Sequence, residues 1–208
     1  MVVKHIVIIF LILFSGCSNP SPERDAIPRG ATVLILGDSL SYGTGADKGQ
    51  DYPSLLAKAT GWNIINAGVP GDTSEQGLER LTGLLEAHHP SLLVVELGGN
   101  DLLRKMQPMT IEHHIKAILA EAKTRGVATV LVAIPAADPL MAAVGNLSDH
   151  PVYEKIAQDT KTPLIKEVFS DVLSDRSLKF DQIHPNADGY AKVAEEMQAN
   201  LKALGFIK

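Results

Sequence analysis

The chain is poor in cysteine and in aromatic residues. Of its 208 residues, one is a cysteine, Cys17, and 5% are Phe, Trp or Tyr. A single cysteine excludes a disulfide within the chain, so the fold has to be held by its apolar core. A length of 208 residues fits one domain of ordinary size with a full hydrophobic core.

Runs of basic residues are also missing. The 19 Lys and Arg are scattered and are outweighed by 24 Asp and Glu, which gives a net charge of −5. A protein that binds nucleic acid needs a basic patch that follows the phosphate backbone. We therefore expect no nucleic-acid partner.

The longest unbroken apolar run, residues 6–14, stands near the start and is too short to span a bilayer. It follows Lys4 and is followed by the small residues Ser15 and Gly16 before Cys17. A positive start, a short apolar run and a small-residue exit are typical of a secretory signal.

The end of this segment, FSGC at residues 14–17, resembles a bacterial lipobox, in which the cysteine is acylated and becomes the first mature residue. The resemblance implies a lipoprotein signal peptide at residues 1–16 and lipidation of Cys17. It also implies anchoring in the bacterial cell envelope, facing the periplasm and in the outer membrane where the cell has one. An ordinary signal with an incidental cysteine is the alternative. Residues 17–29, rich in proline, are interpreted as a tether, and residues 30–208 as the folded domain.

From residue 31 onward, apolar runs typical of buried strands alternate with amphipathic helical patterns. The expected strands are residues 31–36, 62–66, 91–97, 127–134 and 163–165. The expected helices are residues 51–60, 72–88, 110–125, 151–160 and 186–204, and the second should be capped by Asp72 with Glu75. This alternation predicts an α/β fold, a three-layer α/β/α sandwich around a mostly parallel, flavodoxin-like sheet of five strands.

Three polar turns should meet at one edge of this sheet. Residues 37–39, 68–72 and 98–101 each follow an expected strand, and in parallel sheets the sites form outside the carboxyl ends of the strands. Gly37 should permit a tight backbone there and leave the hydroxyl of Ser39 exposed. A serine hydroxyl is a weak nucleophile unless a base takes its proton.

His184 is the candidate base among seven histidines. It lies in DQIHP, residues 181–185, immediately before the last expected helix. An aspartate three residues ahead in a turn, here Asp181, can accept the Nδ1 proton and leave Nε2 free for a serine proton. The alternative is a polar segment that only caps the helix at Asn186. The other histidines fit the signal segment, helix ends, a polar helix face or a loop.

An oxyanion intermediate needs fixed hydrogen-bond donors close to the attacked carbonyl. The turn that ends in Gly71 offers a backbone N–H at a helix start, and the turn at residues 98–101 offers the amide of Asn100. Each turn alone is equally well explained as a helix start or a strand end.

Four blocks, taken together and in order, resemble the GDSL-type, or SGNH, hydrolase superfamily. They are GDSLSYG (37–43), NAGVPGDTS (66–74), ELGGND (96–101) and DQIHPN (181–186). Residues 71–108 look especially like the bacterial acyl-CoA thioesterase I, lysophospholipase and arylesterase branch.

The resemblance implies Ser39 as nucleophile, His184 as general base and then acid, and Asp181 as the residue that orients the imidazole. It implies an oxyanion hole made of the Ser39 N–H, the Gly71 N–H and the Asn100 side-chain amide. The chemistry would be two-step acyl transfer to water from an ester or thioester, for which no metal and no cofactor is needed.

The substrate is expected to be a small ester or a lysolipid. Its acyl chain could lie along apolar residues near the site, unless these pack as ordinary core: Leu102, Leu103, Met106 and Ile134. A carbohydrate O-acetylesterase acting on envelope polysaccharide is the first alternative, although few aromatics are present to stack on sugars. A non-catalytic lipoprotein is the second, although all four blocks are intact. The sequence leaves the oligomeric state open.

Overall fold

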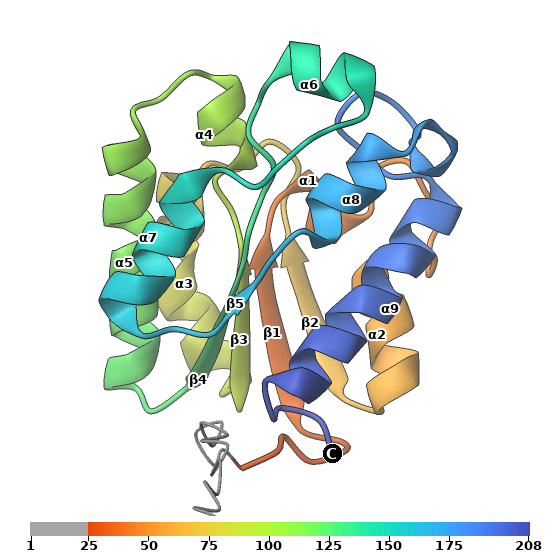
Figure 1. Cartoon of the computed structure of the whole chain (residues 1–208). Coiled ribbons are helices and arrows are strands. Elements are labelled where there is room, and N and C mark those ends of the chain that lie inside the picture. Colours follow the sequence, from red (N-terminus) through yellow and green to blue (C-terminus); the bar gives the residue numbers. More distant parts are fainter. Residues whose placement is uncertain (1–24) are drawn as a thin grey trace, which may run out of the picture.

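A computed structural model describes residues 25–208, so the expected signal peptide, Cys17 and the first part of the tether lie outside the described residues. The described chain is a three-layer α/β/α sandwich (Figure 1). Its middle layer is a five-stranded parallel sheet in the order β2-β1-β3-β4-β5. The strands are β1 (Thr32–Gly37), β2 (Asn63–Gly68), β3 (Leu92–Glu96), β4 (Ala128–Val132) and β5 (Leu164–Ile165). The expected fold class and flavodoxin-like strand order are confirmed.

Longer helices cover both faces of the sheet. One face carries α3 (Ser74–His88), α5 (Pro108–Thr124) and α7 (Pro151–Thr160), and the other carries α2 (Tyr52–Thr60), α8 (Val168–Ser174) and α9 (Ala187–Ala203). The sequence did not predict α8 or the short elements α1 (Ser39–Tyr42), α4 (Gly99–Leu103), α6 (Pro139–Val144) and the 3₁₀ helix Arg176–Leu178. Within residues 25–208, no helix combines the length and hydropathy that crossing a bilayer requires.

β1 is buried because it lies between β2 and β3 and helices cover both faces of the sheet. Residues 33–36 are fully buried, as a continuous apolar run in a parallel sheet should be. Gly37, the last residue of β1, pairs with Gly68 of β2 and with Glu96 of β3. The three strands therefore end level with one another, and the polar turns that follow them leave the sheet side by side.

The start of α3 differs from the sequence prediction by one residue. Thr73, not Asp72, is the N-cap, and it forms a reciprocal capping box with Gln76, not with Glu75. The Asp72 carboxylate is engaged elsewhere, since its Oδ2 binds Arg80 Nε at 2.8 Å.

The described chain begins and ends at the amino-terminal edge of the sheet. The Ile27 N–H donates to the Phe206 carbonyl at 2.9 Å, and Trp62 Nε1 donates to the Ile27 carbonyl at 3.2 Å. Trp62 directly precedes β2, so this edge is opposite the one from which the polar turns emerge (bottom of Figure 1).

Candidate active site

Ser39 is presented by the sharp turn that joins β1 to α1. Asp38 caps α1, since its Oδ1 accepts from the Leu40 N–H at 2.9 Å, and Ser39 is the first residue of that helix. Gly37 is required here for space rather than for a positive φ: a Cβ on it would lie 2.1 Å from Ser41 Oγ. Close packing beneath the turn therefore fixes the backbone that carries Ser39.

His184 has hydrogen-bonding partners at both ring nitrogens. Its Nε2 lies 3.0 Å from Ser39 Oγ, although 145 positions separate the two residues, and its Nδ1 lies 2.8 Å from Asp181 Oδ2. The other Asp181 oxygen accepts from the backbone N–H groups of Ile183 and His184, both at 2.8 Å. With Nδ1 protonated toward the carboxylate, Nε2 is left as an acceptor for the serine hydroxyl.

Hydrogen bonding decides the charge of Asp181. Desolvation acts to raise the pKa of this carboxyl, but the hydrogen bonds from the His184 ring and from the Ile183 and His184 N–H groups outweigh it. The pKa of Asp181 is therefore lowered from its ordinary value. An ionised carboxylate at this position orients the imidazole and stabilises an imidazolium.

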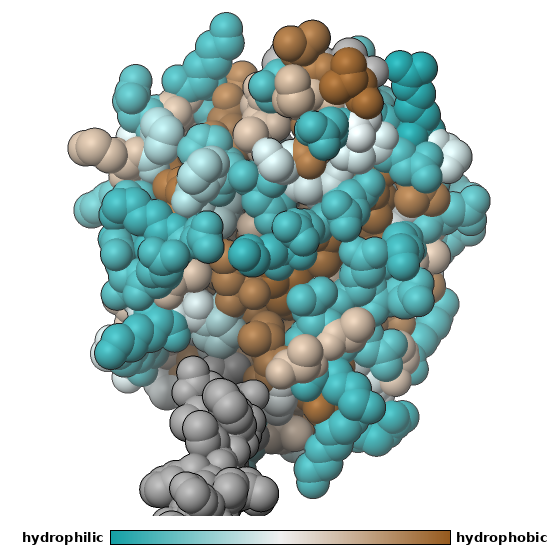
Figure 2. Space-filling view, in the orientation of Figure 1, coloured by the Kyte–Doolittle hydropathy of each residue, from teal (hydrophilic) through white to brown (hydrophobic). Residues whose placement is uncertain are grey.

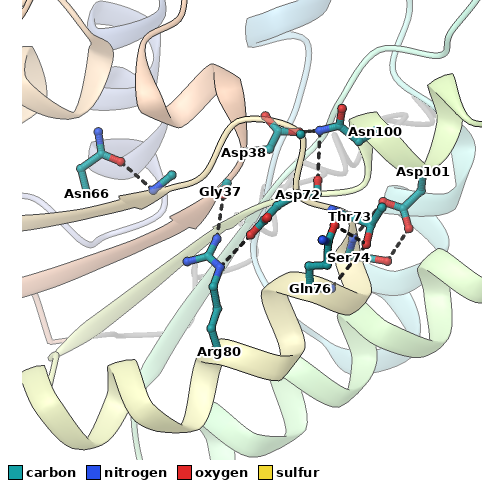
Figure 3. Close-up of polar contacts among 12 residues, drawn as sticks. Gly37, Asp38, Asn66, Asp72, Thr73, Ser74, Gln76, Arg80, Asn100 and Asp101 are labelled. Atoms are coloured by element: carbon teal, nitrogen blue, oxygen red, sulfur yellow. Dashed lines mark hydrogen bonds and ion pairs between the residues drawn. The ribbon is translucent and has the colours of Figure 1, made fainter.

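Asn100, near the start of α4, holds two of the turns together (Figure 3). Its Nδ2 donates to Asp38 Oδ2 and to the Asp72 carbonyl, both at 3.0 Å. Both amide N–H groups thus have protein acceptors. Binding an oxyanion at Asn100 requires that one of them turn toward the substrate.

Gly71 lies in the turn before α3 and has a φ of +85°, a region that favours glycine. Its carbonyl accepts from Arg104 Nη2 at 2.9 Å, and a Cβ on it would meet only that nitrogen, at 4.0 Å. The sequence placed Gly71 at a helix start, but α3 begins only at Ser74. A turn, and not the first turn of the helix, therefore carries its N–H.

Arg80 of α3 binds the end of β1 and the turn that precedes α3 (Figure 3). Its Nε binds Asp72 Oδ2 at 2.8 Å, and its Nη2 donates to the Gly37 carbonyl at 2.9 Å. The guanidinium therefore bridges the end of β1 and the turn that contains Gly71.

A second cluster joins α3, α4 and α5. The Asp101 carboxylate accepts from the Ser74 N–H at 2.8 Å and from Ser74 Oγ at 2.6 Å. Ser74 Oγ also lies 3.1 Å from His114 Nδ1. The sequence placed His114 on a polar helix face, but it has this specific partner, and the cluster holds α4 against the start of α3.

A buried polar network lies beneath the Ser39 turn. Ser41 Oγ is 2.5 Å from Glu96 Oε2 and 2.7 Å from the Tyr52 hydroxyl, and all three side chains are fully buried. Among the described residues, Glu96 Oε1 has no hydrogen-bond partner. Sequence reasoning missed this network, although a glutamate at the end of an otherwise apolar strand was an available signal.

The two buried carboxyl groups near Ser39 both hold their protons more tightly than usual. Burial raises the pKa of Asp38 to about 6, against the opposing effects of the Leu40 N–H, His184 and Asn100. Burial also raises the pKa of Glu96 well above its ordinary value, and the charge of Asp38 adds to this, against hydrogen bonds from the Ser41 hydroxyl and from the backbone N–H groups of Asp38 and Ser41. Glu96 is accordingly the more reluctant of the two to ionise.

An apolar cleft opens beside Ser39 and His184 and encloses about 820 Å³, its open mouth included. Of the four residues predicted to line an acyl groove, Leu103 and Ile134 line this cleft. Leu102 packs against the core instead. Met106 is also outside the lining, because the chain turns at Lys105, where φ is +57°.

Hydrophobic side chains are exposed on α6, the helix between the cleft-lining residues Asp138 and Leu147. Leu140 and Val144 of α6 are about two-thirds exposed, at 67% and 66%. Figure 2 shows hydrophobic side chains gathered over α6 at the top of the molecule. Exposed apolar side chains thus stand on the segment that joins two of the cleft's lining residues.

Comparison with known proteins places this geometry in context. Residues 35–192 match the model of the GDSL-like Lipase/Acylhydrolase family. The chain is 37% identical over 181 residues to Thioesterase 1/protease 1/lysophospholipase L1 of Escherichia coli K12, which covers 83% of this chain and 84% of that protein. It is 29% identical over 191 residues to the arylesterase of Vibrio mimicus, with coverage of 89% and 92%. The psychrotrophic esterase EstA from Pseudoalteromonas sp., solved with monoethylphosphonate as inhibitor, superposes with a TM-score of 0.72 at 28% identity, over 83% of this chain and 97% of that chain.

Proposed function

Because this chain belongs to the GDSL-like lipase/acylhydrolase family and is an ester-hydrolysing enzyme, we propose that Ser39 is its nucleophile, with His184 and Asp181 as base and orienting acid. One observation carries this proposal: the two nitrogens of His184 lie 3.0 Å from Ser39 Oγ and 2.8 Å from Asp181 Oδ2, beside the apolar cleft. These are hydrogen-bonding distances for a nucleophile, a base and a group that orients the base.

The reaction proceeds in two steps. Ser39 Oγ attacks the ester carbonyl while Nε2 of His184 takes its proton, and the acyl–oxygen bond to the leaving group then breaks as the imidazolium protonates the departing alcohol. In the second step, water gives a proton to His184, attacks the acyl-enzyme and releases the carboxylic acid, and Ser39 recovers its proton. Ionised Asp181 stabilises the imidazolium in both steps.

The negative charge that develops on the carbonyl oxygen is bound by the N–H groups of Ser39 and Gly71 and by the side-chain amide of Asn100. The position of Asn100 beside Asp38 supports this role, because the 3.0 Å hydrogen bond fixes the amide at the mouth of the Ser39 turn. Rotation of the amide away from the Asp72 carbonyl would free one N–H for the oxyanion. Donors arranged in this way lower the barrier by several kcal/mol, on the order of 3 each.

The preferred substrates are proposed to be acyl esters with an apolar chain, such as lysophospholipids or aryl esters. Leu103 and Ile134 line the cleft beside Ser39, and α6, which follows the lining residue Asp138, exposes Leu140 and Val144. We infer that these side chains extend the apolar path. A long acyl chain can contact the apolar side chains along this path, whereas an acetyl group is too short to reach them. Thioesters fit the same chemistry, because only the leaving group changes.

The test is hydrolysis of p-nitrophenyl esters from acetate to palmitate by the wild type and by Ser39→Ala. We expect kcat/KM to rise from acetate to intermediate chain lengths, and we expect Ser39→Ala to lose on the order of 10⁴-fold in kcat. Full activity of Ser39→Ala would exclude the mechanism. Activity confined to acetate would instead favour an O-acetylesterase of envelope polysaccharide, and no turnover by folded protein would favour a non-catalytic role.

We also propose that the enzyme is held in the cell envelope by an acylated Cys17, facing the periplasm. The lipobox-like FSGC at residues 14–17 and the proline-rich residues after it support this. Several acyl chains on one cysteine give stable anchoring, since each buried methylene contributes about 0.8 kcal/mol. Mass analysis of the mature amino terminus in the native host checks this proposal, and an unmodified Cys17 would exclude it.

A further inference from the structure

Glu96 occupies an unusual place for a carboxyl group. It ends β3 level with Gly37, directly beneath the turn that carries Ser39, and its side chain is fully buried. The fit is close, since a Cβ on Gly37 would lie 2.7 Å from Glu96 Oε2. One side chain donates to the carboxyl, Ser41 through its Oγ, which also contacts the Tyr52 hydroxyl. Hydrogen bonds from the backbone N–H groups of Asp38 and Ser41 also act to lower the pKa of Glu96, but burial outweighs them.

Glu96 has no positively charged partner in the described part of the chain. Within residues 25–208 it forms no ion pair, and its Oε1 is unpartnered. Among the described residues, its charge acts on Asp38 after β1 and on three tyrosines, Tyr52 of α2, Tyr153 of α7 and Tyr190 of α9. Burial raises the pKa of each tyrosine, so all three stay neutral. A carboxylate left unpaired in such surroundings is costly, whereas the neutral acid is not.

Asp38 is better placed to carry a negative charge, because both of its oxygens are hydrogen-bonded whereas Oε1 of Glu96 has no partner among the described residues. Its two oxygens accept from the Leu40 N–H at 2.9 Å and from Asn100 Nδ2 at 3.0 Å, and the His184 ring lowers its pKa further. Asp72 opposes this charge, but Asp72 is itself bound to Arg80. Two buried carboxyl groups that repel each other do not ionise together, and the better-supported one takes the charge.

We propose that Glu96 is kept as a neutral carboxylic acid and acts as a positioning residue, which leaves Asp38 ionised to hold the Asn100 amide at the proposed oxyanion hole. The role in the reaction rests on the proposed function of Ser39 and Asn100, whereas the protonation of Glu96 does not. A negative Glu96 would force a proton onto Asp38 and remove the ionic acceptor of Asn100. Glu96 would thus affect turnover without touching the substrate.

Infrared spectroscopy tests the protonation directly. At about pH 8, ordinary carboxyl groups and Asp38 are ionised, so a protonated carboxyl stands out by its C=O stretch above the amide I band. We expect this band in the wild type, its loss in Glu96→Gln, and its retention in the matched control Glu121→Gln on α5. Absence of the band from the wild type, or its persistence in Glu96→Gln, would overturn the proposal. Absence of the band from the wild type overturns the proposal even if Glu96→Gln does not fold, and also if the protein cleaves no ester.

The pH profile of p-nitrophenyl ester turnover tests the positioning role. Glu96→Gln replaces a neutral acid with a neutral amide, so its kcat should stay within about threefold of the wild-type value. The pH at which kcat falls on the acid side of the profile should not change. If Glu96 is ionised in the wild type, the result differs. Removing its charge in Glu96→Gln would lower the pKa of Asp38 and move the acid-side fall of kcat to a lower pH by about 1 unit. Such a shift, or a loss of about 100-fold in kcat by folded Glu96→Gln, would overturn the proposal.

Discussion

At the scale of single residues, Asp181 provides the most direct test of the proposed base. Asp181→Asn keeps the size of the side chain but removes the charge that faces His184 Nδ1 at 2.8 Å. The imidazole then loses the partner that fixes its tautomer, so kcat should fall by about 10³–10⁴-fold with little change in KM. Steady-state kinetics on a p-nitrophenyl ester measures both constants.

Asp188→Asn is the matched control, because Asp188 lies in the first turn of α9, close in sequence but outside the Ser39–His184–Asp181 contacts. Its kcat should equal that of the wild type. If Asp181→Asn were as active as Asp188→Asn, the assignment of Asp181 would be wrong.

The ionisation of Asp38 should lower the free energy of unfolding at neutral pH. Its pKa rises from an ordinary 3.8 to about 6, so its ionisation opposes folding by about 3 kcal/mol above pH 6 and not at all below pH 4. The wild type should therefore lose this stability as pH rises from 4 to 7, and Asp38→Asn should not. Urea unfolding of both proteins at the two pH values checks this, and a pH-independent difference between them would contradict it. The variant should be less active, since its amide cannot accept from Asn100 as a carboxylate does.

These residues also mark the limit of what the sequence predicts about the site. Ser39 could be proposed from its place after a strand, and Asp181 with His184 from a three-residue spacing, because these signals are local. The contacts of Asp38 with Asn100 and of Ser41 with Glu96 join different strand ends. They depend on the register of β1 against β3, which no local pattern contains.

At the scale of elements, Arg80 ties α3 to the ends of β1 and β2, with its guanidinium on Asp72 and on the Gly37 carbonyl. Arg80→Ala removes the cation from the partly buried Asp72 carboxylate and one of the two donors to the Gly37 carbonyl, which still accepts from the Val69 N–H at 3.1 Å. The free energy of unfolding should fall by about 2 kcal/mol. The substitution should also lower kcat, because Gly37 and Asp72 flank proposed site residues. Chemical denaturation and ester kinetics measure the two effects.

Arg125→Ala is the control at the same scale. Arg125 of the α5 end binds Glu86 and Glu121 on a more exposed surface, at 3.2 and 3.3 Å. Surface ion pairs contribute at most about 1 kcal/mol, so this variant should be nearly as stable as the wild type and fully active. Equal losses in the two variants would mean that Arg80 has no special role.

The elements themselves were predictable to different degrees. Buried strands and long helices were found within a few residues because their apolar patterns are long. The capping residue of α3 was placed one position early, since Asp72 and Thr73 are both good caps and only the contact with Arg80 separates them. The short helices α4 and α6 contain too few residues for a helical period to be visible.

At the scale of the whole molecule, the alternation of strands and helices predicted a parallel sheet and therefore a shared edge for the polar turns. The cleft was not predictable in this way, because its shape depends on how the loops and helices pack. Leu102 and Leu103 illustrate the difference. They are neighbours of the same chemistry, yet one packs into the core and the other lines the cleft.

The amino-terminal edge of the sheet has a mechanical consequence. Ile27 is fixed beside Phe206 and Trp62, at the far end of the strands from Ser39. β1 alone contains six residues and puts about 20 Å between the two edges. A force applied through attachment of the amino-terminal segment to a surface, such as a bilayer or a bead, therefore acts on the edge opposite the cleft. Immobilisation at that end should leave the cleft unobstructed and the loops that form it free of tension.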